Sequence, residues 1–239
     1  ARAAAAVRIT HELLAGELRA IGINVDCTPV LDLKRPETTT AIGDRAFAAD
    51  PHLVADLGRA AAEGLMAGGV TPVIKHMPGH GRATVDSHLD LPRIDADFDD
   101  LADSDFVPFR KLNDLPWGIT AHLVYRAIDP DRPATLSPRV IAEVIRGEIG
   151  FSGLLVSDDM SMKALQGTLD RLAADLIAAG CDIALHCNGT LDEMRLVAAG
   201  SGPLSPAARL RYERGSQRIN RDPEFDAQEL AEELAELMA

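Results

Sequence analysis

The feature of this sequence that most constrains its fold is a series of short apolar runs that alternate with helical patterns. The runs cover residues 23–33, 70–76, 117–125, 151–159 and 181–187. They are apolar throughout, which is typical of strands buried on both faces of a parallel sheet. We therefore predict an α/β fold, namely a TIM-type (β/α)8 barrel of which about five β/α units are present. The alternative is a doubly wound open sheet, which would normally carry a glycine-rich phosphate turn after its first strand, and none is seen.

Helical patterns lie between these runs, and their ends carry the expected residues. They cover residues 1–23, 51–69, 95–114, 137–150, 169–180, 205–219 and 227–239. Pro51 and the Gly68-Gly69 pair bracket the second helix, while Ser137 is a plausible N-cap and Gly150 a stop for the fourth. We expect one catalytic barrel domain over residues 1–239, with residues 215–239 as a C-terminal helical tail.

The overall composition excludes some partners. The chain has 239 residues and a formal net charge of −13, which argues against nucleic acid or an anionic membrane as the partner. No run approaches the ~20 apolar residues of a membrane-spanning helix. The three cysteines are odd in number and lie in apolar runs, so we interpret them as reduced core residues and expect a cytoplasmic protein.

Polar residues recur where each apolar run ends. They are Asp32, Lys75, His76, His122, Asp158 and the segment 186–188. In a β/α barrel all the strand ends face the catalytic side. The segment 74–92, IKHMPGHGRATVDSHLDLP, adds His80 and His88. It could form a metal site, an acid–base site or a polar loop without a function.

The metal and acid–base interpretations differ in what the spacing allows. His76 and His80 have the i,i+4 spacing of a zinc-binding helix, but Pro78 and Gly79 between them exclude that helix, and no Glu accompanies them. Asp86 and His88 are two residues apart, so in an extended segment both side chains point to the same side. A carboxylate beside an imidazole stabilises the imidazolium, which could protonate a leaving group near neutral pH.

A carboxylate nucleophile would complete such a site, and the run ending in LLVSDD supplies one. Asp158 follows the apolar residues and should emerge into the mouth of the barrel. Asp159 would point elsewhere and cap the following turn through its side chain.

Several motifs resemble those of bacterial β-N-acetylhexosaminidases of glycoside hydrolase family 3. The segments KHMPGHGRATVDSHLDLP and LVSDDMSM are similar to that family's acid–base and nucleophile segments. The segments TPVLDL, IGDRAF, TAHLVY and DPDRPATLSP match its other landmarks in the same order. The resemblance extends to about Arg214 and favours the acid–base interpretation.

The resemblance implies a retaining mechanism on terminal β-linked N-acetylglucosamine of peptidoglycan turnover fragments. It gives Asp158 the role of nucleophile and His88 that of acid and base, with Asp86 orienting His88. Arg45, Lys75 and His76 would bind the sugar hydroxyls, and neither a metal nor a cofactor is expected. A phosphorylase of the same family, a catalytically silent sugar-binding remnant and, least favoured, a metal-dependent hydrolase remain alternatives.

The sequence also departs from the family pattern at its start. The family's barrel begins earlier, with a D-Q-E-G-G segment and an Asp that binds sugar hydroxyls, and neither is found here. Five β/α units cannot close an eight-stranded barrel, so an edge of the sheet would stay unpaired. Either the natural protein is longer and this sequence is a fragment of it, or the chain must cover that edge. If the protein starts at Ala1, we expect an incomplete barrel with poor stability or self-association, and weak or absent hydrolysis.

Overall fold

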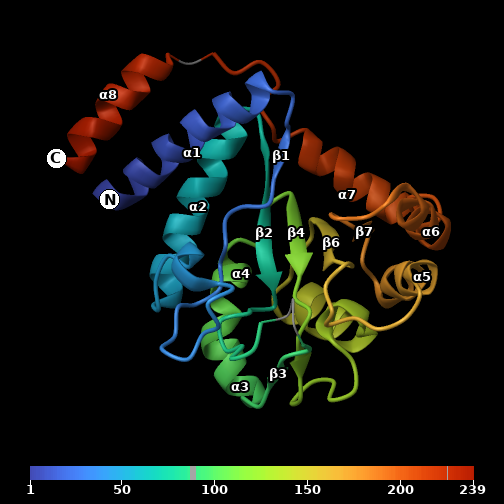
Figure 1. Cartoon of the computed structure of the whole chain (residues 1–239). Coiled ribbons are helices and arrows are strands. Elements are labelled where there is room, and N and C mark those ends of the chain that lie inside the picture. The colour runs from blue at the N-terminus through green and yellow to red at the C-terminus, as the bar shows by residue number, and fades with distance from the viewer. Residues whose placement is uncertain (87–89, 225) are drawn as a thin grey trace.

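The centre of the molecule is a curled, five-stranded parallel sheet. The computed structural model describes residues 1–86, 90–224 and 226–239. The strands run in the order β1-β2-β4-β6-β7, and each neighbouring pair is parallel (Figure 1). Their bounds are Val25–Asp26 (β1), Thr71–Met77 (β2), Trp117–Thr120 (β4), Leu154–Asp159 (β6) and Ile183–Leu185 (β7). Helices connect these strands, which confirms the predicted β/α alternation. In the described ranges the sheet does not close, so the fold is a partial, TIM-barrel-like one.

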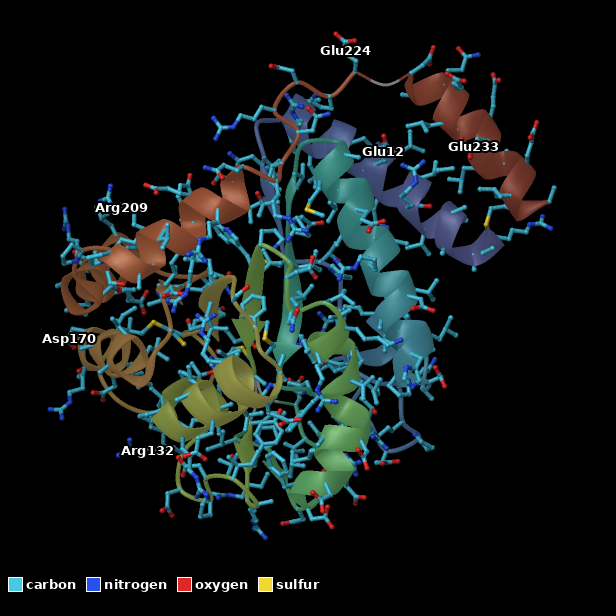
Figure 2. All side chains as sticks on the ribbon, turned by 180° about the vertical axis from the view of Figure 1, so that it is seen from behind. Glu12, Arg132, Asp170, Arg209, Glu224 and Glu233 are labelled. Atoms are coloured by element: carbon cyan, nitrogen blue, oxygen red, sulfur yellow. The ribbon has the colours of Figure 1, made fainter. Side chains whose placement is uncertain are left out.

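Helices cover the sheet on two sides. In Figure 1, α1 and α2 lie beside the β1–β2 edge, whereas α5, α6 and α7 lie beside β6 and β7. The bounds are Arg2–Ala20 (α1), Pro51–Ala67 (α2), Phe98–Asp100 (α3), Leu101–Asp105 (η2), Val107–Lys111 (α4), Val140–Glu148 (η4), Leu169–Ala179 (α5), Leu191–Ser201 (α6), Pro206–Ser216 (α7) and Ala227–Met238 (α8). The last helix, α8, lies along α1, and Arg2 Nε donates to the Leu237 carbonyl at 2.7 Å. Charged side chains such as Arg209 on α7 and Glu233 on α8 project outward (Figure 2).

Two helix starts show how the sequence sets these bounds. Asp50 precedes α2, and its Oδ1 accepts a hydrogen bond from the Leu53 amide at 2.7 Å. Ser137 Oγ accepts one from the Val140 amide at 3.1 Å, so the predicted cap is confirmed. Gly150, with a φ of 73°, ends that segment, as expected.

The strand that was expected over residues 117–125 is divided. The strand β4 ends at Thr120, and residues Val124–Tyr125 form β5, which pairs with Arg93–Ile94 (β3) in a separate two-stranded sheet. The Ala121 amide still donates to the carbonyl of Met77 in β2 at 2.7 Å. The Val124 amide instead donates to the Pro92 carbonyl, next to β3, at 3.0 Å. The chain therefore turns away from the main sheet at His122.

The first strand is shorter than expected, and one helix was not expected. The strand β1 covers only Val25–Asp26, because Pro29 has no amide hydrogen to donate and Val30 forms only an isolated bridge with Lys75. The helix α6 begins at a capping box in which Thr190 and Glu193 bond reciprocally.

The core packs around β2, β4 and β6. Fully buried side chains include Met77, Phe106, Phe109, Tyr125 and Phe151. Gly118 lies where a Cβ would come within 2.0 Å of Met77 Cε, so the absence of a side chain allows this packing. In the described ranges, no helix combines the length and apolar character needed to span a membrane.

Candidate active site

The polar residues at the strand ends gather around a small cavity at the carboxyl ends of β2 and β6. The cavity has a volume of about 230 Å³. Its lining residues are Ala41, Ile42, Arg45, Lys75, His76, His80, Asp158, Asp159, Met162 and Cys187. Four of the six predicted site residues therefore come together here, from two strands and the segment that follows β1. They are Arg45, Lys75, His76 and Asp158.

Asp32 organises one wall of the cavity from below. Its Oδ2 accepts a hydrogen bond from His76 Nδ1 at 2.7 Å, and its Oδ1 accepts from the amides of His76 at 3.2 Å and His80 at 2.6 Å. The ring of His76 meets that of His80 edge to face, with 5.4 Å between centroids. Asp32 thus holds both histidines in place. The sequence had marked this residue only as a strand end.

Burial has opposite consequences for Asp32 and His80. Burial alone would raise the pKa of Asp32, but the charge and hydrogen bonds of His76 and the contacts with His80 lower it below its ordinary value. Burial, reinforced by the neighbouring His76, lowers the pKa of His80 to about 4. At pH 7 the pair therefore consists of an ionised Asp32 and a neutral His80.

Asp158 presents an ionised carboxylate to the cavity. Burial would raise its pKa, but the charges of His76 and His122 and the hydrogen bond from the Asp159 amide bring it below the ordinary value. That amide donates to Asp158 Oδ1 at 2.9 Å. Among the described residues, none donates a hydrogen bond to Oδ2, which leaves this oxygen available for a ligand.

The carboxylate of the adjacent Asp159 is already hydrogen-bonded within the protein. Its Oδ2 accepts from Ser161 Oγ at 2.5 Å, and its Oδ1 accepts from the amides of Ser161 and Cys187, both at 3.0 Å. Asp159 therefore caps the turn after β6, as predicted, and ties that turn to the end of β7. The expectation that Asp159 points elsewhere was wrong, because it lines the cavity together with Asp158, but its two oxygens already accept these hydrogen bonds.

His122 and His186 do not form the walls that the sequence suggested. His122 was expected to line the pocket, but it is fully buried behind Asp159, with Nε2 3.1 Å from the Asp159 carbonyl oxygen. The reason is that β4 ends two residues earlier, so His122 lies on the turn below the cavity. The ring of His186 is buried, with Nδ1 3.9 Å from Asp159 Oδ1, and does not line the cavity.

Two cationic side chains reach the cavity. Lys75 is half-buried at the end of β2, and Arg45 is exposed at the rim. The guanidinium of Arg45 donates to the Ala41 carbonyl, which braces it across its own turn. No described side chain forms an ion pair with Lys75, so its ammonium group is free to meet a ligand.

The predicted acid–base pair is only partly within the described residues. His88 lies outside them, so its predicted role stays a prediction. Asp86 is half-buried in the loop after β2, but it is not among the described residues that line the cavity.

The base of this loop is firmly anchored. Asp105 Oδ2, which is buried, accepts from Arg82 Nε at 2.7 Å and from Arg35 Nη2 at 3.0 Å. Thr38 Oγ1 donates to the Gly81 carbonyl at 2.6 Å. These contacts fix the loop to the segment that carries Arg45, so both approach the cavity as one unit.

Two other cavities, both larger, also lie away from this chemistry. Their volumes are about 540 and 510 Å³. One contains Arg146, Asp182 and Arg211, and the other Trp117 and Tyr212, all near the amino ends of the strands or on α7. In the described ranges, no group of three or more His, Cys, Asp or Glu side chains is arranged to hold a metal ion. The smaller cavity is therefore the strongest candidate for an active site.

Residues 2–206 match the model of the glycosyl hydrolase family 3 N terminal domain. The chain belongs to glycosyl hydrolase family 3. The resemblance inferred from the motifs is therefore confirmed, and the partial barrel corresponds to this family's TIM-barrel-like domain.

Named relatives and solved structures agree with the family. A beta-hexosaminidase of Alkalilimnicola ehrlichii is 46% identical over 180 residues, which cover 74% of this chain and 51% of the relative. A beta-hexosaminidase of Nitrosomonas eutropha is 37% identical over 214 residues, which cover 87% of this chain and 61% of the relative. The structure of NagZ from Neisseria gonorrhoeae in complex with N-trifluoroacetyl-D-glucosamine has a TM-score of 0.85 and 32% identity, and covers 99% of this chain and 70% of that chain. The chain thus spans between half and two thirds of the length of these curated relatives.

Proposed function

We propose that this chain carries the catalytic site of a retaining exo-glycosidase that hydrolyses terminal β-linked N-acetylglucosamine. The observation that carries the proposal is the ionised Asp158, with one carboxylate oxygen unused by the described protein, opposite Lys75 and His76 in a small cavity. Its volume of about 230 Å³ lies below the range typical of drug-sized ligands, which favours a single terminal sugar over a longer chain.

In the first step Asp158 Oδ2 attacks the anomeric carbon, and the bond from that carbon to the glycosidic oxygen breaks. His88 gives its proton to the leaving oxygen. In the second step a water molecule attacks the same carbon, His88 accepts a proton from that water, and the bond to Asp158 breaks. The two displacements together retain the β configuration of the sugar.

Asp86 has the proposed role of orienting His88 and favouring its charged form. This assignment depends on the spacing of the two residues and on the family motif. His76 would bind a sugar hydroxyl through Nε2, because Nδ1 is already bonded to Asp32. Lys75 and Arg45 would bind further hydroxyls as cationic donors.

The substrate assignment is supported by the relatives. Those described above are named beta-hexosaminidases, and the neisserial structure holds an N-acylated glucosamine analogue. Peptidoglycan turnover fragments are proposed as the natural source of the sugar, and a cytoplasmic location stays a prediction. Self-association stays a further prediction.

The experiment combines a chromogenic N-acetyl-β-glucosaminide with a 5-fluoro N-acetylglucosaminyl fluoride that traps the covalent intermediate. The wild-type chain and Asp159→Asn should gain the mass of one sugar, whereas Asp158→Asn should gain none. Asp159→Asn is the matched control because it removes the neighbouring charge of the same type. A sugar adduct on Asp158→Asn would overturn the assignment of the nucleophile.

The products separate the remaining alternatives. Free N-acetylglucosamine of retained configuration would support hydrolysis. A sugar 1-phosphate formed in phosphate buffer would instead show that the enzyme is a phosphorylase. The acid–base histidine favours that second reaction, because an imidazole repels incoming phosphate less than a carboxylate does. Sugar binding with neither product nor adduct would leave the catalytically silent alternative.

A further inference from the structure

A chain of buried hydroxyl and imidazole groups ends at the backbone of Asp159, the residue that follows the proposed nucleophile. Thr120 Oγ1 lies 2.8 Å from Thr135 Oγ1, which lies 2.8 Å from His122 Nδ1. His122 Nε2 in turn lies 3.1 Å from the Asp159 carbonyl oxygen. The side chains of Thr120, Thr135 and His122 are fully buried. None of the three belongs to the residues that line the cavity, so a direct contact with substrate is not their role.

The direction of the hydrogen bonds follows from the protonation of His122. Burial lowers the pKa of His122 below its ordinary value, although the charge of Asp158 opposes this effect. The ring is therefore neutral at pH 7 and carries a single proton. The Asp159 carbonyl can only accept, so this proton must lie on Nε2. Nδ1 is then an acceptor, and the Thr135 hydroxyl donates to it.

The same arrangement decides between two partners of Thr135. Its Oγ1 also lies 3.0 Å from the Ala121 carbonyl, but one hydroxyl proton cannot serve both groups. Donation to Ala121 would move the ring proton to Nδ1 and leave the lone pair of Nε2 facing the lone pairs of the Asp159 carbonyl. Two acceptors that face each other at 3.1 Å repel, whereas the Ala121 carbonyl meets no such repulsion, so donation to His122 is favoured. Thr120 then donates to Thr135 and completes the chain.

The Asp158–Asp159 segment is also held from other directions. Ser157 Oγ donates to the Asp158 carbonyl at 2.8 Å and accepts from the Leu185 amide at 2.9 Å. The Met160 amide donates to the Leu185 carbonyl at 2.9 Å. His122 supplies a side-chain bond to the Asp159 carbonyl from the β4 side of the segment. Without it, the Asp159–Met160 peptide could rotate, and the neighbouring Asp158 would shift with it.

We propose that His122 is a positioning residue for Asp158, with Thr135 holding it in the neutral form protonated on Nε2 so that it fixes the Asp159 carbonyl. This inference rests on the proposed role of Asp158 as the nucleophile. A displacement of about 1 Å at a reacting atom can reduce the rate a hundredfold, so a distant contact of this kind can have a large kinetic effect.

The first test is a histidine ring-nitrogen NMR spectrum of the ¹⁵N-labelled chain between pH 7 and 8, which needs no turnover. The wild type should show His122 neutral and protonated on Nε2 throughout. Thr135→Val removes the hydroxyl at nearly constant shape and leaves Nδ1 without its donor, so the Nδ1 signal should shift while the proton stays on Nε2. Thr135→Ser should restore the wild-type pattern. A wild-type ring that is charged at pH 7, or protonated on Nδ1, would overturn the inference.

The second test measures the rate of adduct formation with the 5-fluoro reagent. His122→Phe should slow it by about tenfold to a hundredfold with little change in sugar affinity, because the binding side chains are untouched. His122→Gln keeps an N–H donor and should recover most of the loss. Equal rates for the two variants would mean that His122 only fills space. An adduct on Asp158→Asn would instead refute the proposed nucleophile, and the NMR result on His122 would stand independently.

Discussion

Asp32 Oδ2 accepts a hydrogen bond from His76 Nδ1 at 2.7 Å, and both side chains are buried. This contact leaves Nε2 as the ring nitrogen of His76 that can meet a ligand. Asp32 also accepts hydrogen bonds from the amides of His76 and His80, so one carboxylate holds the end of β2 and the start of the loop that follows it. The wall of the site is therefore built by a residue that does not itself line the cavity.

Replacing Asp32 should destabilise the protein and weaken sugar binding together. Asp32→Ala leaves His76 and two buried amides without their acceptor, and breaking a buried pair in this way costs about 3–5 kcal/mol. Urea denaturation followed by circular dichroism gives the free energy of unfolding. Asp192→Ala, which removes a side chain that is 89% exposed, should change it by less than about 0.5 kcal/mol. A loss below about 1 kcal/mol in Asp32→Ala would contradict the role of this contact.

Much of the site could be predicted from the sequence because the carboxyl ends of parallel strands lie at the same edge of the sheet. Lys75, His76 and Asp158 each follow a continuous apolar run, so their convergence needs only the strand pattern. The choice of Asp158 over Asp159 rested on strand alternation and on the family resemblance, but both residues line the cavity, so alternation alone does not separate them. The hydrogen bonds from Ser161 and Cys187 to Asp159 agree with that choice.

The rest depends on contacts between segments that are distant in the sequence. The partnership of Asp32 with His76 spans 44 positions, and no local pattern marks it. His122 was misplaced because the apolar run continues to Tyr125 although β4 ends at Thr120. By contrast, α6 had a readable signal, since Thr190 and Glu193 have capping-box spacing before an apolar residue pattern.

The neutral His80 predicts that stability will depend on pH in a defined range. Its pKa is about 4 in the folded protein, whereas the ordinary value is about 6.5. Between these values the unfolded chain binds more protons, so the free energy of unfolding should fall as the pH decreases from about 6.5 toward 4. The limiting slope for one such group is about 1.4 kcal/mol per pH unit. Asp32 and Asp158, whose pKa values are lowered, contribute their loss mainly below about pH 4.

Urea denaturation at pH 5, 6, 7 and 8 measures this dependence. His80→Gln should have a shallower slope than the wild type between pH 5 and 6.5, whatever its absolute stability. His52→Gln, at an exposed position on α2, is the matched control and should keep the wild-type slope. An unchanged slope in His80→Gln would show that His80 is charged in the folded protein at these pH values.

The ion pair between Arg82 and Asp105 should control the proposed acid–base loop. Arg82→Met removes the 2.7 Å contact at the base of the loop, while Arg35 still neutralises Asp105. We expect the protein to remain folded and kcat to fall about tenfold, because the loop is held less accurately. Arg110→Met removes a more exposed pair with Glu148 and should leave kcat unchanged. Steady-state kinetics with the chromogenic substrate tests both variants, and equal kcat values for them would rule out anchoring by Arg82.

Cys187 should report on access to the cavity, because it lines the same space as Asp158. Burial, followed by the charge of Asp159, raises the pKa of Cys187 to about 11, so little thiolate exists at pH 7. Modification by a bulky maleimide should therefore be slow and accelerate about tenfold per pH unit.

N-acetylglucosamine should protect Cys187, and complete modification should block sugar binding. Cys187→Ser should bind sugar normally after the same treatment, which excludes an effect through the exposed Cys27. Cys181, which is buried and has a pKa raised to about 12, should stay unmodified in the folded chain. Mass spectrometry of the digested protein measures the modification of each cysteine. Equal modification of Cys187 with and without sugar would show that the sugar does not bind in this cavity.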